Sequence, residues 1–285
     1  QDIITDLKYS PDGRFLVSIG GDKCLRLWDS TRNYEQIQEW DMGEEVAREA
    51  LTIVSTITPK VSVSDCSKYI AASLRTCVVL KDIENGGTTK SLLVPFAPNE
   101  KIYNTVTRFS SDGRAVFIVS NFEYYANASI TVWHHDLAED DEDRVTTLWR
   151  EEDSNCGAKA FEFFHDKTMI VSQNNMTNTG VLWSIDTDYN MSYKEIRLDF
   201  QGSTGLHFTP DGNYIVVNKE NRRPTLWSIA EGNVTNKTLH FLENGSNSTT
   251  KHDTRVVKSF SPNNRHCIVE QAGSRNRFIT SYFVK

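Results

Sequence analysis

The chain has 285 residues, a formal net charge of −7, 38% apolar residues and 24% charged residues. This composition is that of a globular protein long enough to bury about three-quarters of its unfolded surface. The negative charge argues against nucleic-acid binding by bulk attraction. No apolar run approaches the roughly 20 residues that a membrane-spanning helix needs.

The first 40 residues predict a small four-stranded sheet. Apolar, β-branched runs at 3–9 and 15–19 flank the sequence Ser-Pro-Asp-Gly at 10–13, whose residue types favour a tight turn. We therefore expect a hairpin. A Gly-Gly-Asp turn leads to a third run at 24–28, and a more polar run at 35–40 suits an outer edge strand.

This pattern recurs six times along the chain. The copies begin at Thr5, Lys60, Thr105, Ala158, Ser203 and Thr254. Each ends in an aromatic or apolar anchor: Trp28, Leu80, Trp133, Trp183, Trp227 and Tyr282. Polar outer strands are expected at 88–94, 144–150, 193–198 and 237–242. Repeated units of this kind must stack to bury their apolar faces, so the pattern predicts an all-β fold, a β-propeller of four-stranded antiparallel blades.

The pattern resembles the WD-repeat family, whose blades carry an SPDG-type turn and a closing Trp-Asp dipeptide. The resemblance covers nearly the whole chain and is clearest from Thr5 to Asp29. Among the six closing anchors, only Trp28-Asp29 is an intact Trp-Asp pair, and no copy carries the Gly-His dipeptide common in the family. We therefore expect apolar packing, rather than a His-Asp-Ser-Trp network, to hold each blade. A helical turn is expected only at 43–51.

The six copies predict a single domain over 1–285, forming a six-bladed or an incomplete seven-bladed ring. The chain ends after the third strand of copy six, and neither terminus supplies a fourth strand. We therefore expect either a segment of a longer chain or a ring finished by a partner. An open blade edge can accept an added strand from another molecule.

Cysteine usage bears on the cellular compartment. The five cysteines form no C-x-x-C pair and are scattered: Cys24, Cys66, Cys77, Cys156 and Cys267. Such a set favours buried small side chains in a reducing, intracellular compartment, with the cytoplasm favoured over the nucleus. Seven Asn-x-Ser/Thr sequons occur, four of them between Asn233 and Thr249, and a chain this rich in Asn, Ser and Thr produces several by chance.

No signature of catalysis, of a cofactor or of a metal site is found. The chain has no Gly-Lys dipeptide for a phosphate-binding loop, no H-E-x-x-H motif and no G-x-S-x-G motif. His134 and His135 would point to opposite faces of a strand, so they do not predict a metal pair. The acidic run 139–143 predicts a solvated loop between the third and fourth strands of copy three.

The resemblance implies that loops between second and third strands line one face of the ring, here called the top face. These loops are rich in basic residues, and copy three adds aromatic ones. The predicted partner-binding residues are Phe122, Tyr124, Tyr125, Arg222, Arg223, Arg275, Arg277, Lys23 and Arg75. Arginine forks beside aromatic side chains suit an acidic or phosphorylated peptide. Acidic residues of the blade-joining loops on this face would oppose that charge.

The sequence thus predicts a non-catalytic protein-interaction scaffold, or a sensor or docking domain, that binds other proteins through its top face. Two alternatives stay open at this point. An enzyme with a site in the central channel or top cleft would need convergent polar residues in one pocket. Nucleic-acid recognition through the arginines of copies five and six would weaken steeply with added salt.

Overall fold

The computed structural model divides into two compact units, Gln1–Gly157 and Ala158–Lys285, and each is described by itself. Statements about structure concern the described residues. These are residues 3–43, 59–74, 76–85, 89–96, 102–122, 127–150, 156–164, 167–174, 180–186, 191–196, 203–219, 224–230, 233–242, 255–260, 266–271 and 277–284. The single-domain organisation stays a prediction.

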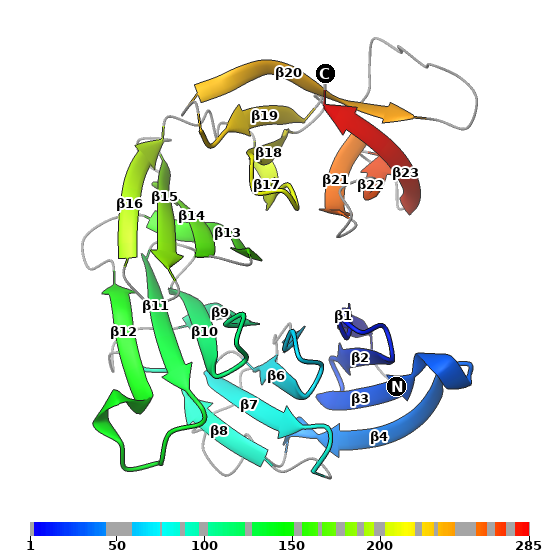
Figure 1. The fold of residues 1–285 in the computed structure, drawn as a ribbon, viewed down its shortest axis with the longest axis vertical. Coiled ribbons are helices and arrows are strands. Elements are labelled where there is room, and N and C mark those ends of the chain that lie inside the picture. Colours follow the sequence, from blue (N-terminus) through cyan, green and yellow to red (C-terminus); the bar gives the residue numbers. More distant parts are fainter. Residues whose placement is uncertain are drawn as a thin grey trace. The chain divides into compact units, whose positions relative to one another are not determined.

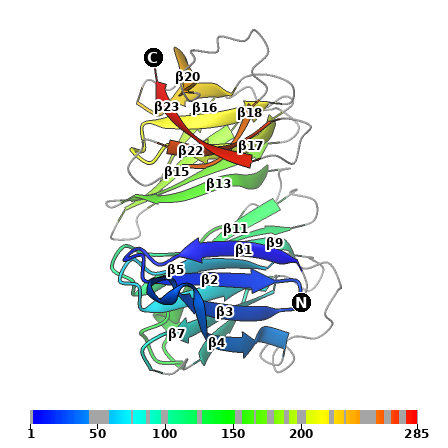
Figure 2. The ribbon, with the colours of Figure 1, turned by 90° about the vertical axis from the view of Figure 1, so that its right-hand side faces the viewer.

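The first unit contains three four-stranded antiparallel sheets, each formed by strands consecutive in sequence (Figures 1 and 2). Blade one consists of β1 (Ile4–Tyr9), β2 (Phe15–Gly20), β3 (Cys24–Asp29) and β4 (Glu35–Asp41). Blade two consists of β5 (Lys60–Val63), β6 (Tyr69–Ser73), β7 (Cys77–Asp82) and β8 (Thr89–Leu93). Blade three consists of β9 (Ile102–Phe109), β10 (Ala115–Phe122), β11 (Asn127–His134) and β12 (Val145–Arg150). The predicted small sheets are confirmed.

The second unit contains one four-stranded sheet and one seven-stranded sheet. Blade four consists of β13 (Cys156–Phe164), β14 (Lys167–Asn174), β15 (Gly180–Asp186) and β16 (Met191–Ile196). The larger sheet joins β17 (Ser203–Phe208), β18 (Tyr214–Lys219), β19 (Thr225–Ser228), β20 (Asn233–Leu242), β21 (Arg255–Phe260), β22 (His266–Gln271) and β23 (Arg277–Val284). Strands β17–β19 start blade five, and β21–β23 start blade six.

Strand β20 corrects the expectation that the chain supplies no fourth strand to the last blade. The first part of β20 pairs with β19, in the register Ser228↔Asn233 to Thr225↔Thr238. Its last four residues, Leu239 to Leu242, pair with Val284 to Ser281 of β23. Because β20 is ten residues long, it reaches past blade five and pairs with the outermost strands of both blades, β19 and β23, which joins them in one seven-stranded sheet.

The expected helical segment 43–51 lies outside the described residues except for Gly43. Two short 3-10 turns lie elsewhere, at Ser30–Arg32 and Glu142–Arg144. The second belongs to the acidic run, which connects β11 to β12 as predicted.

The SPDG-type turns form as the sequence predicts. In blade one, the Ser10 hydroxyl donates to the Asp12 carboxylate at 2.6 Å, and that carboxylate accepts the backbone N–H of Arg14 at 3.0 Å. Gly13 has φ +73°, in the region that favours glycine. The same two bonds recur in blade three with Ser110 and Asp112.

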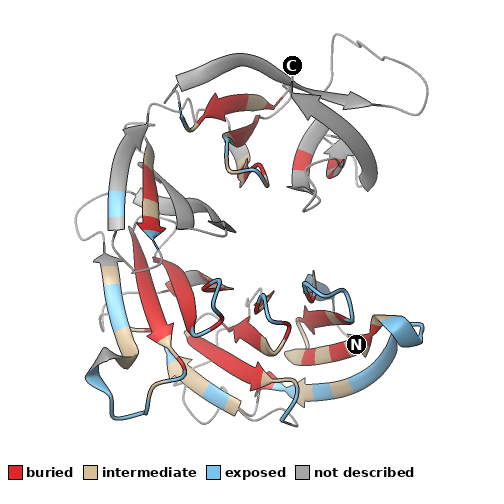
Figure 3. Cartoon of the chain, in the orientation of Figure 1, coloured by how far each residue is buried: buried red, intermediate tan, exposed pale blue. Residues whose placement is uncertain are grey.

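The core lies between the faces of neighbouring sheets. Val17, Ile19 and Leu27 of blade one pack with Val61, Ile70 and Val79 of blade two. A second cluster joins blade two to blade three, and it includes Ala71, Val78, Leu80, Val116 and Trp133. In Figure 3 the middle strands β6, β7, β10 and β11 are buried along most of their length, while β4 and β8 are half-buried or exposed. Apolar packing between small sheets therefore stabilises the unit.

Buried and half-buried hydrogen bonds link consecutive blades. The Asp6 carboxylate accepts the backbone N–H of Val61 at 2.9 Å, and the Ser73 hydroxyl donates to the Thr105 carbonyl at 2.9 Å. In the second unit, the Asn218 amide donates to the Val257 carbonyl at 2.7 Å and accepts the Val257 N–H at 3.0 Å. These contacts fix the position of one blade against the next.

The register of blade two corrects the anchor expected in copy two. Trp28 lies opposite Leu16, one residue into β2. The matching pair in blade two is Ile70 and Lys81, so Lys81 and not Leu80 takes the tryptophan's place. Lys81 is 2% exposed, and its ammonium lies 5.9 Å from the centre of the Trp40 ring of blade one. A long aliphatic stem allows a lysine to fill this position.

Candidate interaction surface

Most of the predicted top-face residues lie outside the described residues. This is the case for Tyr124, Tyr125, Arg75, Arg222, Arg223 and Arg275. The structure places the other three: Lys23, Phe122 and Arg277.

Phe122 is not an exposed aromatic anchor. It is the last residue of β10, it pairs with Asn127 across the hairpin, and its side chain is 1% exposed. It belongs to the cluster between blades two and three that contains Trp133. The sequence analysis placed it in the loop between the second and third strands of copy three. The preceding residues Ser120 and Asn121 are buried, and the strand continues through them to Phe122.

Arg277 was also expected in a loop, but it is the first residue of β23, opposite Glu270 of β22. Its backbone is therefore part of the last sheet.

Lys23 lies where the sequence predicts, in the turn between β2 and β3. Its φ is +60°, its N–H donates to the Gly20 carbonyl at 3.0 Å, and its own carbonyl accepts the N–H of Met42 at 2.9 Å. Because Met42 follows β4, this contact ties the turn to the segment that leaves blade one. The half-buried Lys23 is therefore held in a defined place.

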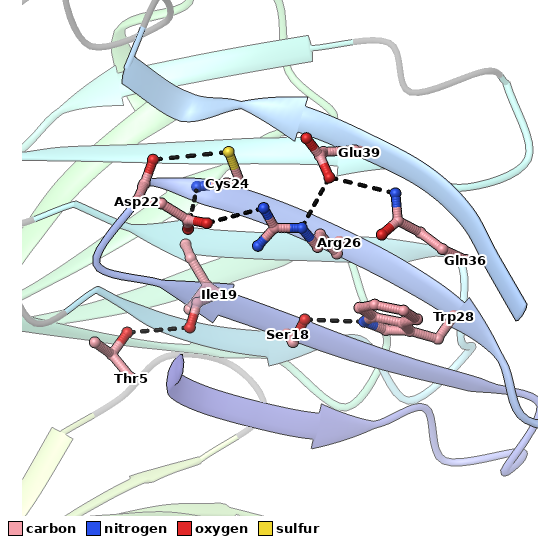
Figure 4. Close-up of polar contacts among 9 residues, drawn as sticks. All are labelled: Thr5, Ser18, Ile19, Asp22, Cys24, Arg26, Trp28, Gln36 and Glu39. Carbon is pink, nitrogen blue, oxygen red and sulfur yellow. Dashed lines mark hydrogen bonds and ion pairs between the residues drawn. The ribbon is translucent and has the colours of Figure 1, made fainter. Parts of the chain in front are cut away.

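Beside this turn, Arg26 joins two carboxylates (Figure 4). Its Nη2 lies 2.8 Å from Asp22 Oδ2, and its Nε lies 2.8 Å from Glu39 Oε2. The bond from Arg26 is the main reason that the pKa of Asp22 is below its usual value, and the same bond raises the pKa of Arg26. Asp22 precedes Lys23 in the turn between β2 and β3, and its charge is paired with Arg26.

This ion-pair cluster depends on strand register, which is why the sequence did not reveal it. Arg26 and Glu39 are directly opposite in the β3–β4 pair. Cross-strand neighbours of opposite charge attract each other. The alternation of side chains along β3 does indicate from the sequence that Arg26 lies on the same face as Trp28.

Apolar side chains are exposed on this same face of blade one, here called the outer face because the opposite face packs on blade two. Leu7 is 45% exposed and Tyr9 is 53% exposed, both in β1. The hydroxyls of Tyr9 and Tyr34 lie 2.8 Å apart, and this hydrogen bond raises the pKa of Tyr9. Trp28 is half-buried, and its indole Nε1 donates to the Ser18 hydroxyl at 2.9 Å (Figure 4).

His135 has a structural position between blades two and three. It is 5% exposed, its Nε2 lies 2.7 Å from the Gly113 carbonyl, and its ring packs edge-on against Tyr69 at 4.9 Å between centroids. Burial lowers its pKa.

Within the described part of the chain, no three His, Cys, Asp or Glu side chains gather as metal ligands would. Over the same residues, no helix has the length and apolarity to cross a membrane.

Comparisons with known proteins agree with this fold. Residues 1–29 match the family model described as WD domain, G-beta repeat. No curated protein sequence matches the chain. Because the family model covers the first repeat, it confirms the resemblance at the copy where the sequence pattern is clearest.

Solved structures, two of them described as propellers, are similar over almost all of the chain. The β-propeller domain of Myceliophteria thermophila Cps50 (Swd1) is 12% identical, with 98% of this chain and 83% of that chain covered and a TM-score of 0.62. The Dos1 propeller is 11% identical, with 99% and 78% covered and a TM-score of 0.63. Kuenenia stuttgartiensis hydrazine synthase is 16% identical, with 97% and 76% covered and a TM-score of 0.61. At these identities the likeness shows the β-propeller fold and no shared activity.

Proposed function

We propose, from the premise that this chain is a WD-repeat β-propeller, that it is a non-catalytic scaffold or docking domain that binds other proteins. The observation that carries the proposal is the set of hydrogen bonds between blades, such as Asp6 with Val61 and Ser73 with Thr105. Rigid elements joined in this way hold their connecting loops in fixed positions. Loops on a rigid frame are suited to recognition.

The top face stays the proposed binding surface, with one residue removed. Phe122 is buried, so the aromatic contribution rests on Tyr124 and Tyr125. The basic residues are Lys23, Arg75, Arg222, Arg223, Arg275 and Arg277. A guanidinium binds carboxylate or phosphate with two parallel hydrogen bonds, so an acidic or phosphorylated peptide is the proposed ligand.

The test is a charge reversal, Arg222→Glu with Arg223→Glu, in the full-length protein produced in its own cells. Partners recovered with the wild-type protein are identified by mass spectrometry and quantified against the variant. We expect recovery of specific partners to fall at least about tenfold, as removal of central arginines does at interfaces. The matched control is Arg14→Glu with Arg32→Glu, two exposed arginines in the turns of blade one. If the two variants recover the specific partners equally well, the top face is not the binding surface. If the wild-type protein recovers no specific partner, the proposed function is wrong.

We further propose a cytoplasmic location, because the cysteines form no C-x-x-C pair. Of the described cysteines, Cys77 and Cys267 are buried, Cys24 is half-buried and Cys66 is exposed. Imaging of the full-length protein with a fluorescent tag tests this location.

A further inference from the structure

Blade two has a neighbouring blade on each face, so its outer edge is the part that another protein can reach. One face packs with Val17 and Leu27 of blade one, and the other packs with Val116 and Trp133 of blade three. All three blades belong to the first unit. Strand β8 is the last strand of this sheet and, within the described part of the chain, pairs with β7 alone (Figure 1). An edge strand presents its outer backbone groups in the plane of the sheet, away from both packed faces.

The direction of the backbone groups at the end of β8 follows from one hydrogen bond. The N–H of Val94, directly after β8, donates to the Thr76 carbonyl at 2.8 Å, on the side of β7. Successive residues of a strand direct their N–H groups to opposite edges. The N–H of Leu93 therefore points away from β7, where no strand of the described residues lies. An outward group of this kind can pair with an added strand.

The same end of β8 exposes apolar side chains. Leu93 lies opposite Cys77 and is 45% exposed, and Phe96, three residues further along the chain, is 42% exposed. The preceding residue, Leu92, packs instead against the cluster between blades two and three. The edge therefore offers apolar surface as well as backbone hydrogen bonding.

The other outer strands carry features that discourage strand addition. Register shifts interrupt the pairing of β4 with β3 and of β12 with β11. Strand β4 also carries three carboxylates, at Glu35, Glu39 and Asp41. Strand β16 has no register shift but carries Lys194 and Glu195, and β20 pairs with two strands. Bulges and charged side chains are the usual protection of a sheet edge.

Strand β8 lacks this protection. Its pairing with β7 runs without a register shift along all five residues from Thr89 to Leu93. Its one charged residue is Lys90, whose ammonium donates to the carbonyl of His135 at 2.5 Å, directly after β11 of blade three. A regular edge without carboxylates, whose single cation is held by the neighbouring blade, favours an uncharged strand.

We propose that the outer edge of β8 receives an extended, uncharged segment of a partner protein as an added β-strand. The backbone of the segment pairs with β8 from Leu93 onward, and its apolar side chains, at every second position, pack on Leu93 and Phe96. The proposal rests on the proposed function, since it assigns a second surface and a partner class to the same binding role. It differs from the top face in selecting an uncharged segment and not an acidic one.

The first test is residue-resolved hydrogen exchange of the full-length protein, alone and in the assembly isolated from its own cells. We expect exchange of the Leu93 amide to slow at least about tenfold in the assembly, because an added strand accepts its N–H. Equal rates in both samples overturn the proposal. Slow exchange already in the isolated protein also overturns it, because the edge is then covered by the chain itself.

Asp41 provides the matched comparison in blade one. It lies opposite Cys24, as Leu93 lies opposite Cys77, and the following N–H, of Met42, donates to the Lys23 carbonyl at 2.9 Å. Its own N–H therefore also points outward. We expect the exchange rate of the Asp41 amide to stay the same in the assembly. Equal slowing at Asp41 and Leu93 would overturn the assignment to β8.

The second test separates backbone pairing from side-chain contact at one position. Leu93→Pro removes the outward N–H and no bond to β7, and an edge strand tolerates proline at such a position. Leu93→Ala keeps the N–H and removes most of the side chain. Recovery of the specific partner should fall at least about tenfold with Leu93→Pro and about threefold or less with Leu93→Ala. Unchanged recovery with Leu93→Pro, or equal losses with both variants, overturns strand addition. The exchange test uses the wild-type protein, so it does not depend on the folding of Leu93→Pro.

Two further results separate this inference from its alternatives. Native mass spectrometry of the isolated protein would overturn it by showing a dimer that Leu93→Pro dissociates, because a second copy then occupies the edge. If Leu93→Pro retains a partner that Arg222→Glu with Arg223→Glu loses, the inference fails and the proposed function stands. If the wild-type protein recovers no specific partner, both fail.

Discussion

The Trp28 indole donates to the Ser18 hydroxyl at 2.9 Å, whereas the matching indole N–H groups of Trp133 and Trp227 are buried without a partner among the described residues. The register explains the difference. Ser18 lies two residues after Leu16, the residue opposite Trp28. Ile118 and Val217 occupy the same place in blades three and five. One blade thus keeps a polar link that the other two replace with apolar packing.

The first prediction concerns this link. Ser18→Ala should lower the free energy of unfolding by about 1 kcal/mol, because the Trp28 N–H loses its acceptor in a half-buried place. Urea denaturation followed by circular dichroism measures the change. A double-mutant cycle with Trp28→Phe isolates the pair. If Ser18→Ala lowers the free energy of unfolding as much in the Trp28→Phe background as in the wild type, the hydrogen bond between Ser18 and Trp28 contributes nothing to stability.

The second prediction compares two buried threonines. The Thr131 hydroxyl has no hydrogen-bond partner within the described part of the chain, so Thr131→Val should be neutral or raise the free energy of unfolding by up to about 1 kcal/mol. The Thr107 hydroxyl lies 3.1 Å from that of Ser62 on the neighbouring blade. Thr107→Val leaves Ser62 unpaired and should lower the free energy of unfolding by about 1–2 kcal/mol.

Denaturation of both valine variants under the same conditions tests this contrast. The two threonines are both 1% exposed, so the change in volume and burial is matched. Equal effects of the two substitutions would contradict the assignment of the hydrogen bonds.

The third prediction is a pH dependence that arises from His135. Burial lowers its pKa, and the ammonium of Lys90 adds to this, while the bond to Gly113 and the charge of Asp136 act in the opposite direction. As the pH falls, His135 of the unfolded chain therefore binds a proton at about pH 6.5, whereas His135 of the folded protein binds one only at a lower pH. The contribution of neutral His135 to the free energy of unfolding is fully present above about pH 6.5 and is lost as the pH falls below that value.

Comparison of wild type and His135→Gln at pH 7.5 and pH 5.5 tests this dependence. The wild type should lose roughly 1 kcal/mol more stability over this interval than the variant does. A titration of His135 by NMR should give a pKa below the ordinary histidine value. A wild type and variant with parallel pH profiles would be the contrary result.

The fourth prediction concerns the joint between blades five and six. The Asn218 amide bonds both backbone groups of Val257, at 2.7 and 3.0 Å, and is 1% exposed. Asn218→Ala leaves two buried backbone groups unpaired and should cost about 3 kcal/mol or more. The control is Asn213→Ala, an exposed turn residue whose backbone N–H bonds Asp211. Hydrogen exchange of Val257 should accelerate in the first variant only, and slow exchange in both would argue against this role.

The sequence determined the small sheets of this protein, because their turn chemistry and strand alternation are local. Ser10, Asp12 and Gly13 form their turn through contacts within five residues, so a short sequence is enough to predict it. The same locality predicted the turn at Lys23 and the position of the acidic run. These features follow from backbone geometry and side-chain hydrogen bonding.

Tertiary structure decided the features that depend on how strands pair. Lys81 replaces a tryptophan because blade two's register shifts the position by one residue from Leu80. Phe122 is buried because β10 continues through two polar residues that the neighbouring strands cover. Strand β20 reaches β23 and closes part of an edge that the sequence left open. The ion pairs of Arg26 form because β3 and β4 bring residues 13 positions apart into contact. Pairing between distant segments sets which side chains meet, and no local pattern encodes that choice.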